Sequence, residues 1–234
     1  SAALAGVIVL GAREGRFGRK GEKKSMIPFA ASSIPLVTLG TFLLWFGWFG
    51  FNGFSQLAMG TFDDVNAIAK IAVNTHLAGA AGVVTGAVLT RLIGGKTDII
   101  MMLNGALAGL VAITAEPLTP TPITAMLIGS IGALIMYYGT KLLEYLRLDD
   151  VVGAIPVHLF AGIFGTLVVP LTNTGTSFGI QLLGVISVCA FSFILSYAAF
   201  KLMKETTGLR ISKAAEKLGT DKAEVGVAAY SIRD

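Results

Sequence analysis

Long stretches without a charged residue constrain this chain more than any other feature of its sequence. An α-helix needs about 20 apolar residues to cross a bilayer. Stretches of this length or slightly shorter that lack Asp, Glu, Lys and Arg cover residues 35–55, 71–90, 99–115, 121–140, 151–170 and, after a polar start, 171–200. Only 14% of all residues are charged, against about 25% in soluble domains. The sequence therefore predicts an all-α, polytopic membrane bundle.

The pattern assigns six membrane-spanning helices and a short tail. The predicted helices cover residues 35–57, 64–90, 98–115, 121–145, 151–170 and 177–205. Residues 1–11 are too short to span and have no charged lead, so we interpret them as the last turns of a helix that begins upstream. We therefore expect a fragment of a longer protein. Residues 1–206 are predicted to form a transmembrane domain, and residues 207–234 a tail too short for an independent domain.

Basic residues gather on one side of this six-helix topology. All 18 Lys and Arg residues except Lys70 lie in the loop 12–34, in 91–98, in 141–150 or after residue 200. The positive-inside rule makes that side, including the C-terminal tail, cytoplasmic. The one-sided distribution of the basic residues, rather than the net charge of +4, thus indicates the orientation of a multi-pass protein of the cell membrane. We expect membrane lipid around it and no nucleic-acid partner.

The sequence contains no recognisable enzyme or metal-binding motif. Its single cysteine, Cys189, lies in a predicted helix, and no metal-ligand spacing is present. The acidic pairs Asp63–Asp64 and Asp149–Asp150 are predicted at opposite membrane faces, where we interpret them as helix caps. We therefore predict a protein that is not an enzyme and has no metal or cofactor.

Glycines recur one turn apart inside two predicted helices. They form Gly82-x-x-x-Gly86 and Gly105-x-x-x-Gly109. Small residues on one helix face allow two backbones to approach closely in lipid. The spacing predicts tightly packed helices.

Two histidines lie within the apolar stretches, where ionisable residues are costly and are functional candidates by default. Asn74 and Thr75 beside His76 offer hydrogen-bond partners, which favours a structural, neutral imidazole there. His158 has few such neighbours, and the ordinary pKa of histidine lies near physiological pH, which favours a functional role. A haem protein with both histidines as axial ligands is a further hypothesis, and the absence of a Soret band would contradict it.

The segment LWFGWFGFNGFS at 44–55 concentrates aromatic residues before a polar end. Trp48, Phe51 and Ser55 recur at spacings of three and four, so they share one helix face. An aromatic face attracts cations, and a hydroxyl above it can accept hydrogen bonds from a cation with N–H groups. An interfacial aromatic belt explains the same pattern equally well. The residues alone leave both interpretations open.

Four segments, LLWFGWFGFNGFS, NTH, GALAGLVAIT and DDVVGAIPVHLFAG, together resemble the ammonium transporter family (Amt/Mep/Rh). The resemblance implies an eleven-helix fold with two inverted repeats around a narrow pore in each subunit of a trimer. The chain is similar to the end of helix 5 through helix 11 and the cytoplasmic tail. It implies that Phe51 gates the pore from outside, that Ser55 recruits ammonium, and that His158 is the second of twin pore histidines.

The implied function is ammonium transport. Ammonium is recruited at the vestibule of Trp48, Phe51 and Ser55 and loses a proton, and histidines assist the passage of ammonia and of the proton, with His76 a secondary candidate. Leu159 and Phe160 depart from the family pattern after His158, as does the tail at 213–215. These departures motivate the alternative of a non-conducting ammonium sensor coupled to a cytoplasmic signalling partner.

Overall fold

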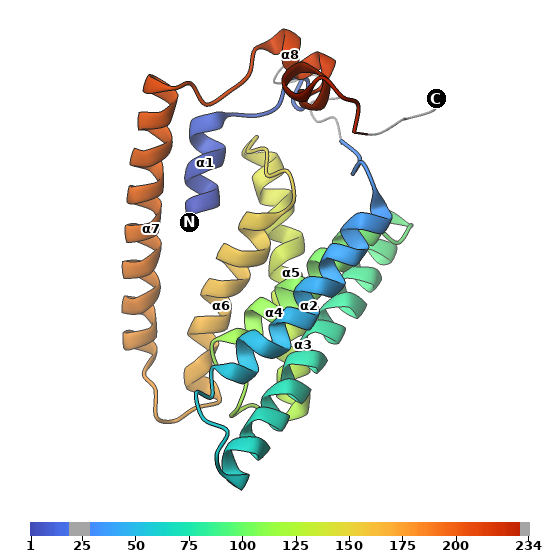
Figure 1. The fold of residues 1–234 in the computed structure, drawn as a ribbon. Helices are drawn as coiled ribbons and strands as arrows, with labels where there is room; N and C mark the ends of the chain where they lie inside the picture. Colours follow the sequence, from blue (N-terminus) through green and yellow to red (C-terminus); the bar gives the residue numbers. More distant parts are fainter. Residues whose placement is uncertain (19–28, 230–234) are drawn as a thin grey trace. The chain divides into compact units, whose positions relative to one another are not determined.

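The computed structural model describes residues 1–18 and 29–229, and the regular elements of these residues are helices (Figure 1). In chain order they are α1 (Ala2–Leu10), α2 (Ile34–Phe54), α3 (Phe62–Gly94), α4 (Ile99–Thr114), α5 (Pro122–Tyr145), η1 (Ile155–Phe160), α6 (Ala161–Val168), η2 (Val169–Leu171), α7 (Phe178–Thr206), α8 (Lys213–Leu218) and η3 (Asp221–Val225). The predicted all-α class is confirmed. Arg19, Lys20, Lys23, Lys24 and Arg233, which contribute to the predicted basic side, lie outside the described residues.

Each predicted membrane-spanning segment corresponds to a helix or a run of helices. Among the described residues, α2, α3, α5 and α7 are long and apolar enough to cross a membrane. Helix α4 and the run Ile155–Leu171 are also apolar but shorter. At 1.5 Å per residue, the 16 residues of α4 extend about 24 Å, less than a bilayer core of about 30 Å.

The chain divides into two compact units. The larger unit comprises Ser33–Leu142 and Val151–Cys189, and the smaller unit comprises Ser1–Ser32, Leu143–Asp150 and Ala190–Asp234. In the larger unit, Leu107, Leu110, Met136, Val157 and Ala161 belong to one buried apolar cluster. That cluster draws on α4, α5, η1 and α6, so these helices share one core.

Glycines bring α3 and α4 into backbone contact, as their spacing predicts. A Cβ added to Gly105 would lie 2.5 Å from the carbonyl oxygen of Gly82, and one added to Gly86 would lie 2.8 Å from that of Met101. Real Cβ atoms are not found this close to a backbone oxygen, so only glycine fits at either position. The close contact is the small-residue packing that the sequence predicts for helices in lipid.

Helix ends in the larger unit are fixed by their own side chains. Thr61 caps α3 and, with Asp64, forms a capping box in which each side chain binds the other residue's backbone N–H. Asp98 caps α4 by accepting hydrogen bonds from the N–H groups of Ile100 and Met101, at 2.9 and 3.1 Å. The interpretation of the Asp63–Asp64 pair as a helix cap is therefore confirmed for Asp64.

Replacing Gly105 with alanine tests the contact between α3 and α4. We expect G105A to destabilise the folded protein by about 1–3 kcal/mol, because the helices must separate to admit the methyl group. SDS-induced unfolding in mixed micelles measures this loss. G40A in α2 is the matched control, since a Cβ at Gly40 meets no atom within 4 Å. Equal unfolding midpoints for the two variants would contradict the glycine-dependent packing.

Candidate functional site

A mostly apolar hollow of about 640 Å³ lies within the larger unit, between α2, α4 and the η1–α6 run. Its lining consists of Leu43, Leu44, Gly47, Trp48, Phe51, Val111, Thr114, Ala115, His158, Gly162 and Thr166. Three residues predicted to form the site, Trp48, Phe51 and His158, therefore border the same space. They come from segments more than 100 residues apart, which sequence spacing alone cannot bring together.

Helix α2 presents different aromatic residues to the hollow and to α3. Trp48 and Phe51 line the hollow, and their ring centroids lie 6.1 Å apart in an edge-to-face arrangement. On the side towards α3, the rings of Trp45 and Phe49 lie 5.5 and 6.2 Å from the imidazole of His76. The aromatic segment thus splits into one set of rings that borders the hollow and another that packs on α3.

The indole of Trp48 in α2 is held by a hydrogen bond to α4. Its Nε1–H donates to the hydroxyl oxygen of Thr114 at 2.7 Å, and that hydroxyl donates to the carbonyl of Leu110 at 2.6 Å. The hydroxyl of Thr166 donates to the carbonyl of Gly162 in its own helix at 3.0 Å. The donor hydrogens of Trp48, Thr114 and Thr166 are therefore used within the protein.

His158 lies in a turn of π-helix, Ile155–Phe160, that continues into α6. Pro156 at the start of this turn has no N–H to donate, and π-helical turns occur often at functional sites. Val157, next to His158, is only 2% exposed and packs in the core cluster, whereas His158 is exposed at the hollow. The buried neighbour fixes the helix, and the helix directs His158 to the hollow.

The two bulky residues after His158 do not line the hollow. Leu159 and Phe160 are half-buried and absent from its lining. A Cβ added to Gly139 of α5 would lie 2.5 Å from the Phe160 ring, so this ring packs closely on the α5 backbone. Phe160 therefore contributes to the packing of helices, and neither residue lines the space beside His158.

Ser55 and His76 lie outside the lining of the hollow. Ser55 ends α2, is exposed, and donates its hydroxyl to the carbonyl of Phe51 at 2.7 Å. His76 contacts the two aromatic rings of α2 rather than its polar sequence neighbours. Asn74 instead donates to the carbonyls of Pro117 and Pro120, both at 2.8 Å, and Thr75 accepts a hydrogen bond from Asn52 at 3.0 Å. The polar residues beside His76 thus serve the packing of α2, α3 and the loop after α4.

Thr114, Thr166 and Glu116 are residues that the sequence did not single out. The carboxylate of Glu116 accepts a hydrogen bond from the Asn173 amide at 2.8 Å and from the N–H groups of Leu118 and Thr119 at 3.2 and 3.3 Å. It thereby links the end of α4 to the end of the η1–α6–η2 run, the two elements that form one wall of the hollow. The only sign of Glu116 in the sequence is its position as an acidic residue directly after the apolar segment 99–115.

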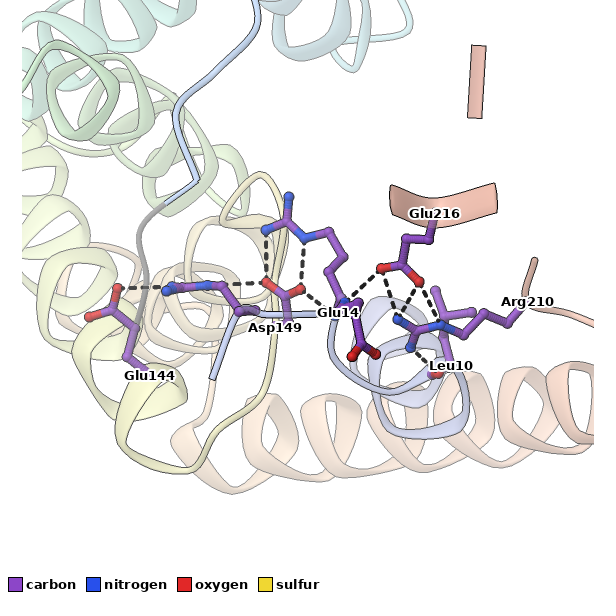
Figure 2. A network of polar contacts seen from close by, with 8 residues as sticks. Leu10, Glu14, Glu144, Asp149, Arg210 and Glu216 are labelled. Carbon is purple, nitrogen blue, oxygen red and sulfur yellow. Dashed lines mark hydrogen bonds and ion pairs between the residues drawn. The ribbon is translucent and has the colours of Figure 1, made fainter. Parts of the chain in front are cut away.

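A second polar site lies in the smaller unit, and Figure 2 shows Asp149 and Glu144 within it. Arg13 donates to Asp149 from its backbone N–H at 2.9 Å and from its guanidinium at 2.7 and 2.9 Å. Arg16 pairs with Asp149 at 3.4 Å and with Glu144 at 3.3 Å. The side chain of Asp149 is only 2% exposed. The interpretation of Asp149 as a helix cap is therefore wrong: its carboxylate binds Arg13 and Arg16 of the basic loop.

The same network connects the tail to the segment after α1. Glu216 of α8 accepts hydrogen bonds from the guanidinium of Arg210 at 2.8 Å and from the backbone N–H of Glu14 at 2.7 Å (Figure 2). Arg210 also donates to the carbonyl of Leu10 at 3.2 Å. Two hydrogen bonds lower the pKa of Glu216: the larger effect comes from the Glu14 backbone N–H and the next from the Arg210 guanidinium.

Burial raises the pKa of Asp149, but the hydrogen bonds and positive charge of Arg13 outweigh it, so the pKa is lowered overall. The hydrogen bond to Asp149 likewise raises the pKa of Arg13. Both shifts favour the charged pair. Among the described residues, no group of three or more His, Cys, Asp or Glu side chains is arranged to hold a metal ion.

Apolar helices of membrane-spanning length around an apolar hollow with one histidine are typical of a multi-pass membrane transport protein. The family model described as Ammonium Transporter Family matches residues 1–230. The chain belongs to this family.

Relatives and solved structures agree with this assignment. Ammonium transporter Amt2 of Archaeoglobus fulgidus is 40% identical, over 97% of this chain and 52% of its own length. A structure of a protein named Sensor Amt Protein is 34% identical with a TM-score of 0.86, covering 95% of this chain and 56% of that one. Mep2 of Candida albicans is 28% identical with a TM-score of 0.79, covering 96% and 52%. The chain spans about half the length of the curated relatives it matches.

The hydrogen bond between Trp48 and Thr114 predicts different effects for two similar substitutions in the hollow. T114V leaves the Trp48 N–H without its partner, so we expect a loss of about 1–3 kcal/mol in the free energy of unfolding. T166V removes only a bond within its own helix turn, and we expect a smaller loss. Unfolding of both variants in mixed micelles measures the difference. A loss for T166V as large as that for T114V would contradict this role of Thr114.

The ion pair between Arg13 and Asp149 predicts a pH-dependent stability. Because the pKa of Asp149 is lowered in the folded protein, its contribution is present above the unfolded value of 3.8 and disappears as the pH falls through the folded value. We expect D149N to cost on the order of 1.5–3 kcal/mol at pH 7 and to unfold with a weaker pH dependence below pH 4. Thermal unfolding in detergent between pH 3 and 7 measures both effects. D63N, at an exposed position in the first turn of α3, is the control, and a D149N curve parallel to wild type in acid would contradict the assignment.

Proposed function

We propose that the protein transports ammonium across a membrane. The residues that line the hollow between α2, α4 and the η1–α6 run form one wall of its pore. This proposal rests on the observation that Trp48, Phe51 and His158 line the same, mostly apolar space. Transport is the function that the name of the Archaeoglobus relative states for that protein. This chain covers about half the length of such relatives, so ammonium transport is proposed for the complete protein.

Recruitment takes place at the end of α2. The aromatic faces of Trp48 and Phe51 attract a small cation through their quadrupoles. The Ser55 hydroxyl, whose hydrogen is directed to the Phe51 carbonyl, keeps its oxygen lone pairs available to accept a hydrogen bond from an ammonium N–H. Ammonium ions with N–H donors are favoured here over sodium ions, which have none.

Passage through the hollow requires that ammonium gives up its charge. A charge in an apolar, membrane-embedded space is costly, and the lining offers few groups to replace water. An N–H bond of ammonium breaks, ammonia keeps the electron pair, and the proton passes to an acceptor. His158 takes part in this relay, since one imidazole nitrogen accepts a proton while the other donates one. In a trimer with a cytoplasmic tail, each subunit has its own such pathway.

A non-conducting ammonium sensor is the second candidate function. It is favoured by the high similarity to the structure named Sensor Amt Protein. The tail network of Arg210, Glu216 and the Glu14 backbone gives such a sensor a connection between membrane helix and tail. A signalling partner would then bind at the tail. Ammonium binding without sustained current distinguishes this function from transport.

Current measurements on the complete protein in proteoliposomes test the transport proposal. We expect a saturable current after an ammonium concentration jump and none after a sodium jump. H158A should abolish the current or its selectivity for ammonium, because it removes the proton acceptor. H76A is the control, since His76 lies outside the lining of the hollow, and it should keep the wild-type current. A normal ammonium-selective current in H158A would contradict the relay.

A further inference from the structure

A half-buried carboxylate lies at the end of α4, next to the hollow that contains His158. It belongs to Glu116, which directly follows two residues of the lining, Thr114 and Ala115. Glu116 itself is absent from the lining. Two residues of chain span at most about 7 Å, so the carboxylate lies on the order of 10 Å from a cation within the hollow. Its charge therefore acts on the hollow through space rather than by contact.

The charge of Glu116 is not cancelled by a partner. The carboxylate accepts hydrogen bonds from the Asn173 amide at 2.8 Å and from the N–H groups of Leu118 and Thr119 at 3.2 and 3.3 Å. All three donors are neutral groups, so they hold the carboxylate in place and leave its charge. Within the part of the chain that the structure describes, Glu116 forms no ion pair.

Other charges on the same side of the predicted topology do not offset Glu116. The segments 56–70, 116–120 and 171–176 carry three acidic residues and one lysine. That lysine, Lys70, is exposed on α3 and forms no ion pair with any residue that the structure describes. The other two acids, Asp63 and Asp64, already exceed its charge. This side of the larger unit is therefore negative.

The carboxylate lies towards the end of the hollow where recruitment is proposed. Short loops join α2 to α3 and α3 to α4, so α2 and α4 run in the same direction (Figure 1). The hydrogen bond from Trp48 to Thr114 shows where the two helices meet. Beyond this point α2 continues to Phe51 and Ser55, and the chain after α4 continues to Glu116. The carboxylate and the recruiting groups thus lie at the same end.

A negative charge at this distance adds a longer-range attraction to that of the aromatic rings. The rings of Trp48 and Phe51 attract a cation within about 6 Å. A charge about 10 Å away, at an effective dielectric constant of about 20 to 80, raises the local concentration of a monovalent cation by about 2- to 15-fold. Salt screens this attraction, because the Debye length is only about 8 Å at 0.15 M ionic strength. The contribution of the carboxylate therefore depends on salt.

We propose that Glu116 sets the affinity of the recruitment step for ammonium through its negative charge. This inference rests on the proposed function and adds a residue to it that does not line the hollow. The hydrogen bonds from Asn173 and from the loop after α4 then have a second consequence: they keep the charge at the entrance. Selection of ammonium among cations remains with the aromatic and hydroxyl groups.

The affinity of the complete protein for ammonium tests this proposal. KM is measured from ammonium currents in proteoliposomes, and Kd from calorimetric titration in detergent. E116Q keeps the shape of the side chain and removes its charge, so both constants should rise about 3- to 10-fold at low ionic strength. The current at saturating ammonium should stay near wild type. E116D keeps the charge and should restore the wild-type constants.

Salt dependence separates the charge from the structural role of Glu116. The wild-type KM should rise as sodium chloride is added, and the difference between wild type and E116Q should vanish at about 0.5 M, where screening is strong. N173A removes the amide that binds the carboxylate but keeps the charge, so it should change KM less than E116Q does. Equal rises for these two variants would overturn the proposal. So would a wild-type KM that is independent of salt, a result that needs no variant to fold.

The same measurements distinguish failure of this inference from failure of the proposed function. An ammonium current with equal KM in wild type and E116Q would overturn the role of Glu116 and leave transport supported. Ammonium binding without current would contradict transport, and the Kd values would then decide the role of Glu116. A wild-type protein with neither current nor binding would overturn both proposals.

Discussion

The backbone contact between α3 and α4 is the constraint on which the larger unit depends. Helices in lipid gain little from apolar burial alone, so they associate through close van der Waals contact. Gly82 and Gly105 allow that contact because neither has a Cβ. When α4 is fixed on α3, the other sides of α4 can contact α2 and α6. The hollow lies between α2, α4 and α6. The short helix α4, in which 8 of 16 residues are buried, therefore borders both the core and the candidate site.

Polar groups in the larger unit are mostly used to hold apolar helices in place. Asn52 joins α2 to α3 through Thr75, Trp48 joins α2 to α4 through Thr114, and Glu116 joins the end of α4 to Asn173. Each bond lies between elements that also pack through apolar side chains. A hydrogen bond between packed elements fixes which of their residues face each other, which apolar contacts alone do not determine.

The sequence was sufficient to predict the helices and to name three of the residues that line the hollow. Charge-free length predicted each apolar helix, and glycine spacing predicted the contact of α3 with α4, because both properties are local. Trp48, Phe51 and His158 were predicted as site residues, but their common hollow depends on the packing of three helices. Asp149 was misread for the same reason: its partner Arg13 lies 136 residues away. Thr114 and Glu116 carry no sequence motif, and only the folded chain shows what they bind.

The internal hydrogen bonds of the hollow bear directly on the proposed transport of ammonia. A hydrated cation that enters an apolar space needs new ligands for the water it loses. Here the hydroxyls of Thr114 and Thr166 donate to helix carbonyls, which leaves only their oxygens as ligands for a cation, and the Thr114 oxygen already accepts the Trp48 N–H. His158 apart, the remaining side chains of the lining are aromatic or aliphatic, and such a surface cannot replace the water that an ion loses. The small number of oxygen ligands in the hollow therefore supports the proposal that ammonia crosses it as a neutral molecule and that the proton is transferred at His158.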